Sequence, residues 1–218
     1  MMRMTGAVMV LAMLAAVPVA AQFSDSYSFL KAVKDKDGGK ATEFLDKPGN
    51  TIVNSRDGDT GETALHIVTR RGDLTWVGFL LGKGANMNSK DRDGNTPLII
   101  ASVARWSEGV ALFTKLKADP NAQNRLGETA LLKAVQGRDS YNSKALLDAG
   151  ANPDINDSSG ISARSAATND PRAASIARMM KDVPVRAAKP VQGPSLEAGC
   201  LPPPGGEGDS APAERGGD

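Results

Sequence analysis

The stretch from Gly61 to Val68 returns along this chain at a fixed interval of 33 residues. Three copies follow it, the last of them worn, and they begin at Gly94, Gly127 and Gly160. The second half of each unit repeats as well, because the run from Leu80 to Asn88 matches the run from Leu146 to Asp154. A fixed period of this size, free of insertions, predicts a solenoid in which each unit buries its apolar face only against its neighbours.

Each copy also carries the signals of a helix start. A hydroxyl side chain that can cap a helix N-terminus stands at one repeated position, which is occupied by Thr63, Thr96, Thr129 and Ser162. Pro97 follows at the first helical position, where its missing N–H costs nothing. A leucine that we expect in the core comes two residues after each threonine, at Leu65, Leu98 and Leu131.

A second helix is predicted in each unit. One amphipathic face is formed by residues at helical spacing, and in the first full unit these are Trp76, Val77, Leu80 and Leu81. We interpret Trp76 as a packing residue of this face. Gly84 and Gly150 stand where the helix must end in a residue of positive φ, whereas Lys117 takes that position in the unit between them. A hairpin-like loop with Asp93-Gly94 as its turn then leads to the next unit.

With this period and these motifs the chain resembles the ankyrin-repeat family, whose signature is Thr-Pro-Leu-His-x-Ala. Residues Thr63-Ala64-Leu65-His66 and Thr96-Pro97-Leu98 carry the resemblance, although no single copy has the whole signature. The similarity covers roughly residues 25–182. It implies an all-α solenoid of about five helix-turn-helix units with hairpin-like loops and terminal units that act as caps.

The two ends of the array depart from the repeat. An apolar stripe at Phe29, Leu30, Ala32 and Val33 indicates an atypical first unit, and Gly38-Gly39 is expected to break its helix. In the last copy Arg164 replaces the core leucine, as suits a cap that faces water. From Pro184 onward the chain contains seven of its 13 prolines and no helical or strand period, which predicts a disordered tail. Pro202-Pro203-Pro204 could dock on an aromatic groove or serve only as a spacer.

We therefore expect seven segments. They are a signal peptide (1–21), an N-terminal capping repeat (22–57), three full repeats (58–90, 91–123 and 124–156), a C-terminal capping repeat (157–183) and a disordered Pro/Gly-rich tail (184–218). Arg3, the apolar run from Ala7 to Val17, and Val19-Ala20-Ala21 form the pattern of a secretory signal. Cleavage after Ala21 would leave Gln22 first, and the alternative is an uncleaved anchor. The pattern predicts a periplasmic or secreted protein.

The net charge and the cysteine content bear on which ligands the chain can bind and on whether it can form a disulfide. Removal of residues 1–21 takes away Arg3 alone of the 26 basic side chains, so 25 basic residues remain against 25 acidic ones. A neutral chain does not favour nucleic acid, whose binding needs a basic excess. Cys200 is the only cysteine, so no internal disulfide can form. We expect no nucleic acid, no membrane contact after signal cleavage, and a monomer.

Catalysis is not indicated by the sequence. His66 is the only histidine, and a catalytic role requires a nucleophile and an orienting group nearby. The resemblance implies instead that His66 hydrogen-bonds to loop backbone and stiffens the stack. Asp57-Gly58-Asp59 and Asp91-Arg92-Asp93 lack the spacing of an EF-hand loop and are better interpreted as turn residues than as a calcium site. We expect no enzyme, cofactor or metal, and the alternative is a hydrolase with an unrecognised acidic site.

The resemblance implies that a partner is held by hairpin tips and by inner helices that line a concave groove. Carried over by position, the candidate binding residues are Arg70, Arg71, Arg92, Asn95, Trp106, Arg125 and Glu128. Arg92 and Arg125 occupy one place in successive units and should form a short ladder, although a solvated rim would look the same. Trp106 stands at a loop-like position and could be an exposed anchor.

These expectations together predict a non-catalytic, exported adaptor that binds one unidentified protein partner through its groove and hairpin tips. Two alternatives remain open. One is a secreted effector or an inhibitor or immunity protein. The other, suggested by the resemblance, is a support factor for a periplasmic oxidative-stress enzyme such as a catalase.

Overall fold

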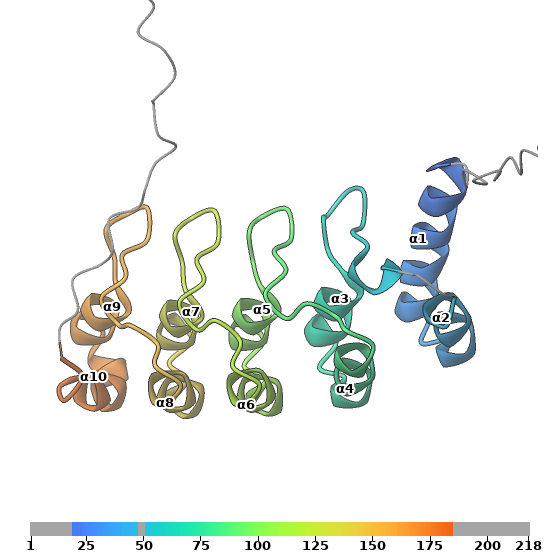
Figure 1. The fold of residues 1–218 in the computed structure, drawn as a ribbon. Coiled ribbons are helices and arrows are strands. Elements are labelled where there is room, and N and C mark those ends of the chain that lie inside the picture. Colours follow the sequence, from blue (N-terminus) through green and yellow to red (C-terminus); the bar gives the residue numbers. More distant parts are fainter. Residues whose placement is uncertain (1–18, 48–50, 185–218) are drawn as a thin grey trace, which may run out of the picture. The chain divides into compact units, whose positions relative to one another are not determined.

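A computed structural model of the protein describes residues 19–47 and 51–184, and within them regular structure is almost entirely helical (Figure 1). The helices are α1 (Val19–Lys34), α2 (Gly38–Leu45), η1 (Ile52–Asn54), α3 (Ala64–Arg70), α4 (Leu74–Gly82), α5 (Pro97–Val103), α6 (Ser107–Lys115), α7 (Ala130–Gln136), α8 (Ser140–Asp148), α9 (Ala163–Asn169), η2 (Pro171–Ala173) and α10 (Ala174–Met180). None of these helices is long and apolar enough to span a bilayer.

Three of the expected segments fall partly or wholly outside the described residues. They are residues 1–18 of the predicted signal peptide, residues 48–50 of the predicted N-terminal capping repeat, and the tail from residue 185 onward. The short motif Val19-Ala20-Ala21, after which cleavage is expected, forms the start of α1.

The repeats stack side by side as two layers of helices beneath a row of hairpins (Figure 1). The inner layer contains α3, α5, α7 and α9, and the outer layer contains α4, α6, α8 and α10. Leu65, Leu98 and Leu131 are at most 1% exposed, because each inner helix packs against the inner helix of the next repeat. The predicted all-α solenoid with its leucine core is confirmed.

Capping follows the predicted positions at Thr96, Thr129 and Ser162, whereas the Thr63 hydroxyl lies 2.8 Å from His66 Nδ1. Backbone N–H groups donate to the side-chain hydroxyls at 3.4 Å for Ile99 to Thr96 and at 3.2 Å for Leu132 to Thr129. Pro97 is the first residue of α5, as expected. The hydroxyl of Ser162 accepts from the third residue of α9 in the same way, at 3.1 Å. These bonds satisfy N–H groups that a helix start otherwise leaves unpaired.

In the repeat 91–123 the outer helix begins differently from the outer helices of the neighbouring repeats. Asp73 and Asp139 cap α4 and α8 through their carboxylates, but Trp106 takes this place at α6 and provides no side-chain cap. Its indole ring instead covers Gly109, where an added Cβ would lie 2.1 Å from a ring carbon. Trp106 is half-buried against the core, so the expectation of an exposed anchor is wrong.

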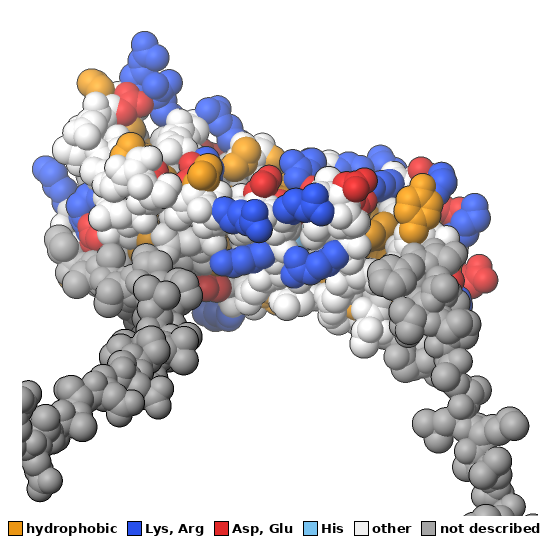
Figure 2. Space-filling view, turned by 90° about the horizontal axis from the view of Figure 1, so that it is seen from above, with side chains coloured by type: hydrophobic (Ala, Val, Ile, Leu, Met, Phe, Trp, Pro, Cys, Tyr) orange, Lys and Arg blue, Asp and Glu red, His pale blue; other side chains and the backbone are white. Residues whose placement is uncertain are grey.

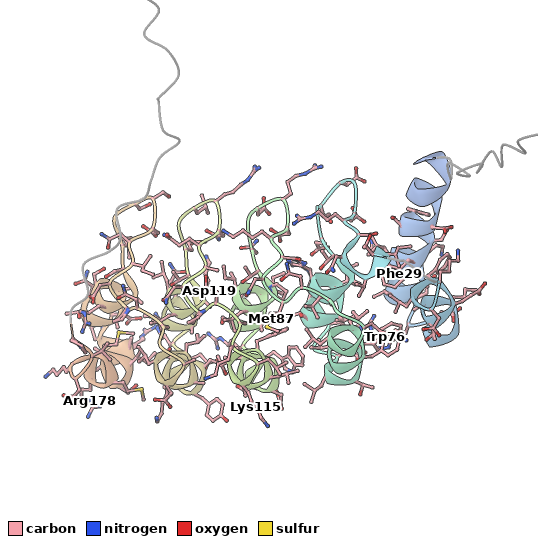
Figure 3. All side chains as sticks on the ribbon, in the orientation of Figure 1. Phe29, Trp76, Met87, Lys115, Asp119 and Arg178 are labelled. Atoms are coloured by element: carbon pink, nitrogen blue, oxygen red, sulfur yellow. The ribbon has the colours of Figure 1, made fainter. Side chains whose placement is uncertain are left out.

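Trp76 lies on the predicted core face of α4. It packs edge-on against Phe79, with ring centroids 5.7 Å apart, and reaches toward Gly38 of the first repeat (Figure 3). The interpretation of Trp76 as a packing residue is confirmed.

The first repeat differs from the prediction at its helix break. Helix α1 ends at Lys34 and α2 already begins at Gly38, so the break lies before the two glycines. Lys36 takes the positive φ of 60° there, and the Asp37 carboxylate accepts a hydrogen bond from the N–H of Lys40 at 3.0 Å. A capping aspartate therefore sets the break, and the glycines belong to the first turn of α2.

Arg164 does not face water as expected. Its guanidinium donates to both carboxylate oxygens of Asp154, at 2.6 and 3.1 Å, and also to the carbonyls of Met180 and Val183. Arginine has donors enough to satisfy the carbonyls at the end of α10, which a leucine could not do. The cap is therefore formed by a hydrogen-bonding side chain at the core position.

Candidate protein-binding surface

Backbone hydrogen bonds join each hairpin to the next. The donor and acceptor recur at one position in every hairpin: Arg92 N to Thr60 O at 2.9 Å, Arg125 N to Asp93 O at 2.9 Å, and Ser158 N to Leu126 O at 2.8 Å. We call this row of three bonds the tip ladder. Because it uses only main-chain atoms, the side chains at the tips can vary without breaking it.

Glycines permit this close approach of the hairpins. Gly94 adopts a φ of +82°, and a Cβ at this residue would lie 2.8 Å from the backbone nitrogen of Arg125. Gly61 stands in the same relation to the backbone nitrogen of Arg92, with a φ of +69° and 2.8 Å. The repeated glycine is therefore required both by its backbone conformation and by the neighbouring hairpin.

His66 connects one repeat to the next hairpin. Its Nε2–H donates to the carbonyl of Asn95 at 3.0 Å, and its Nδ1 accepts from the N–H of Thr63 at 3.1 Å. Burial lowers the pKa of His66, although the bond to Asn95 and the charge of Asp91 act in the opposite direction. The predicted structural role is confirmed, and neither ring nitrogen is left for proton transfer.

The predicted binding residue Asn95 is part of the hairpin framework. Its N–H and its side-chain amide both donate to the Asp91 carboxylate, at 2.8 and 3.2 Å. Its amide oxygen accepts from Asn124 of the next hairpin at 3.1 Å. The acidic turn residue Asp91 thus stabilises its own hairpin through these bonds, in line with the turn interpretation.

The carboxylate of Glu128 likewise forms its hydrogen bonds within the protein. It is buried, and its carboxylate accepts from Lys133 Nζ at 2.6 Å and from the Asn124 amide at 2.9 Å. Burial alone would raise the pKa of Glu128, but the hydrogen bonds from Lys133 and Asn124 outweigh it and hold the pKa below its usual value. A partner would meet this ion pair as a fixed element of the groove wall.

Arg70 and Arg71 point to different parts of the molecule. Arg70 pairs with Glu62 and lines a hollow of about 420 Å³ beside the hairpin tips, together with Arg92 and Asp93. Arg71 donates instead to the carbonyl of Val33 at 3.0 Å and to Asp73 at 3.1 Å. The expectation that Arg71 joins the groove cluster is therefore wrong, because this residue fixes the first repeat to the second.

Arg92 and Arg125 are the two candidates that reach solvent at the hairpin tips. Both are exposed, and the tip ladder places them on adjacent hairpins, as predicted. Arg92 donates to the carbonyl of Gly58 at 2.6 Å, whereas the side chain of Arg125 makes no hydrogen bond or ion pair with any described residue.

An exposed apolar pair lies beside Arg125, and one of its members, Val103, was not singled out from the sequence. Val103 at the end of α5 and Leu126 at the hairpin tip are 60% and 59% exposed, and both line a second hollow of about 470 Å³. Asp93, Glu128 and Lys133 also line it. Val103 occupies the repeat position of Arg70, 33 residues on, and this correspondence could have identified it.

Comparisons with known proteins agree with the repeat architecture. The family described as ankyrin repeats (3 copies) matches residues 20–124. An ankyrin repeat-containing protein of Treponema pallidum (strain Nichols) is 30% identical over 147 residues, which are 66% of this chain and 48% of that protein. Protein lin-12 of Caenorhabditis elegans is 41% identical over 59 residues, 27% of this chain and 4% of that protein.

The chain spans less than half the length of these curated relatives. The residues that match the family model, 20–124, contain the 33-residue period and the paired helices α3 to α6. The chain belongs to the ankyrin-repeat family.

Proposed function

We propose that this protein is an exported, non-catalytic adaptor that binds a protein partner through its hairpin tips and the adjoining ends of its inner helices. Ankyrin repeats are generally protein–protein interaction modules, and the family is typically non-enzymatic. The observation that carries the proposal is the exposed pair Val103 and Leu126, which lies in a hollow rimmed by charged side chains.

This surface has the composition of a binding site. Burial of each apolar side chain at its centre can stabilise a complex by up to about 1.5–3 kcal/mol. The charged side chains at the rim fix the orientation of the partner. Asp93 and Arg125 offer one acidic and one basic group beside the apolar pair. The Glu128–Lys133 pair is already satisfied within the protein and holds the wall of the hollow in place.

The arrangement offers little for catalysis. His66, the only histidine, is buried with both ring nitrogens hydrogen-bonded, so it cannot take a proton from a substrate. One carboxylate oxygen each of Asp57 and Asp91 accepts from backbone N–H groups of its own hairpin, and the other accepts from Lys34 Nζ and the Asn95 amide, respectively. We therefore assign the surface around Val103 and Leu126 to recognition.

The test is affinity capture from an envelope extract with the wild-type protein and with Val103→Asp combined with Leu126→Asp. Both side chains are exposed, so the double variant should fold normally and keep its melting temperature. The wild type should retain a specific protein, and the variant should lose it, because two carboxylates would be buried in the complex. Equal retention by both proteins would show that this hollow is not the site.

Export is proposed from the pattern at Arg3, the run from Ala7 to Val17, and Val19-Ala20-Ala21. N-terminal sequencing of the protein recovered from cells should begin within a residue or two of Gln22. Recovery of the full-length chain from the cytosol would contradict this part of the proposal.

A further inference from the structure

Basic side chains gather in two short rows on the hairpin side of the molecule (Figure 2). Four of them, Arg56, Lys90, Arg92 and Arg125, surround a hollow of about 440 Å³ between the first three hairpins. We call this cluster the basic crest. We propose that the basic crest binds an acidic peptide segment of the protein partner. This inference rests on the proposed function and adds the chemistry of the ligand and a site that adjoins the Val103–Leu126 hollow at Arg125.

Neighbouring hairpins hold three of the four side chains in place. Arg56 donates to the carbonyl of Lys90, and Lys90 Nζ donates to the carbonyl of Gln123 at 2.7 Å. Arg92 donates in the opposite direction, to the carbonyl of Gly58. Each bond uses one donor and leaves others free, since an ammonium has three N–H groups and a guanidinium has five. The cations are thus preorganised, which lowers the entropy lost when a ligand binds.

The positive charge of the crest is not neutralised by ion pairs within the described part of the chain. No ion pair among the described residues involves any of these four side chains. Asp91 is the single acidic residue that lines the hollow, and it is buried with both oxygens turned to Asn95. Four exposed cations therefore face solvent around a single carboxylate, that of Asp91, which is already hydrogen-bonded to Asn95.

The cluster is confined to the first three hairpins. One row begins with Arg56 and Lys90 and continues with Gln123 and Asn156, where the amide of Gln123 repeats the same side-chain-to-carbonyl bond at 3.1 Å. The other row contains Arg92 and Arg125 and continues with Ser158. The hydrogen bonds between hairpins thus continue along the array through uncharged residues. The positive charges of the first three hairpins are therefore not required for these bonds.

The ligand that fits is a carboxylate-bearing peptide, because exposed guanidinium groups pair with carboxylates through two parallel hydrogen bonds. A nucleic acid would bring a long row of phosphates. That row would meet the exposed carboxylates Asp59 and Asp93, which line the hollow on the groove side of the same hairpins. A chain with a formal net charge of +1 also lacks the broad basic surface that such a ligand uses.

The experiment measures fluorescence anisotropy of a labelled peptide of alternating glutamate and glycine, at low and high salt. Three double variants each remove two positive charges: Arg56→Gln with Lys90→Gln at the crest, Lys36→Gln with Lys117→Gln in the turns that follow α1 and α6, and Lys115→Gln with Arg178→Gln on the outer helices. Lys115 and Arg178 lie on the side of the array away from the hairpins (Figure 3). Arg125→Gln serves as a fourth variant, because that side chain bonds to no described residue and its loss cannot disturb the hydrogen bonds between hairpins.

We expect the crest double variant to weaken peptide binding about five- to tenfold and Arg125→Gln about twofold, as for exposed ion pairs, with high salt removing the difference. The two control double variants should stay close to the wild type. Three outcomes would overturn the inference: no peptide binding by the wild type at low salt, equal weakening by all three double variants, or tighter binding of a short oligothymidine than of the peptide. Because the peptide assay needs no partner, failure of the capture experiment alone would instead contradict the proposed function.

Discussion

The helix layers and the hairpin row of a single repeat are held together by different forces. Leu98 in α5 is 1% exposed, and its position between neighbouring inner helices depends on apolar packing. The hairpins are joined by the main-chain bonds of the tip ladder, which make no demand on side-chain identity beyond a glycine. Arg92 and Arg125 can therefore stand where the next hairpin has Ser158, with the same backbone bond in each case.

This difference separates stability from recognition within each unit. In the helix layers the identity of a side chain decides whether the repeat folds, so one residue type recurs there at one position. In the hairpin row the residue type is free, and it can be chosen for a partner. The four predictions that follow test how sharp this separation is, from the largest expected effect to the smallest.

Leu98→Ala should destabilise the protein by about 2–5 kcal/mol, because it leaves a cavity between repeats on both sides. Chemical denaturation monitored by circular dichroism gives the free energy of unfolding. A loss below about 0.5 kcal/mol, the size usual for surface changes, would show that the helix layers tolerate side-chain changes as the hairpins do.

Gly94→Ala should cost more than Gly150→Ala, although both glycines have positive φ. The φ angles are +82° and +90°, but only at Gly94 would the new Cβ meet a neighbour, 2.8 Å from the backbone nitrogen of Arg125. The conformational strain is about 1–2 kcal/mol in each case. The same unfolding assay should give an additional loss at Gly94 alone. Equal losses would mean that the hairpins can separate without cost.

Stability should fall as the pH is lowered below 6.5, because the pKa of His66 is lower in the folded protein than in the unfolded chain. Burial lowers the pKa of His66 in the folded protein, so the unfolded chain takes up the proton first and is favoured below pH 6.5. Above that pH the contribution of this group is constant. Thermal unfolding at pH values on both sides of 6.5 measures the effect, and His66→Gln should remove the slope. A slope that persists in the variant would have to come from another group.

Arg92→Glu combined with Arg125→Glu should change the free energy of unfolding by less than about 1 kcal/mol, since both side chains are exposed and the tip ladder uses only their backbone. Lys115→Glu combined with Arg178→Glu gives the matched charge change on the outer helices. If the hairpin variant unfolds at a clearly lower denaturant concentration than this control, the tips contribute to folding and the separation fails.

The helix layers could be predicted well from the sequence because the residues that determine them recur in every repeat. Leucine, threonine and glycine recur at fixed positions, and each has one structural reason to be there: burial, capping or positive φ. Lys117 shows the limit of this reasoning, since it adopts a φ of 64° at the position where Gly84 and Gly150 stand. Position within the unit therefore determined the backbone more strongly than residue type did.

The binding surface was predicted less completely. Arg70 and Arg71 were placed in one cluster, but consecutive helical residues point about 100° apart, so both cannot face the groove. Two members of the basic crest, Arg56 and Lys90, were missed because the first hairpin has one additional residue. Asp57 N donates to Glu62 O, whereas Asp91 N donates to Asn95 O, and Arg56 therefore corresponds to Lys90 and not to Ser89. A strict 33-residue alignment hides this correspondence.

The tip ladder gives this array a built-in reporter of local opening. Its three donor amides, those of Arg92, Arg125 and Ser158, each belong to a different pair of neighbouring hairpins. Hydrogen exchange at one of these amides therefore measures how often that pair of hairpins separates, independently of the others. A partner that clamps two hairpins together should slow the exchange of the amide between them and leave the rest unchanged. The pattern of protected amides would thus map the position of the partner along the array, one pair of hairpins at a time.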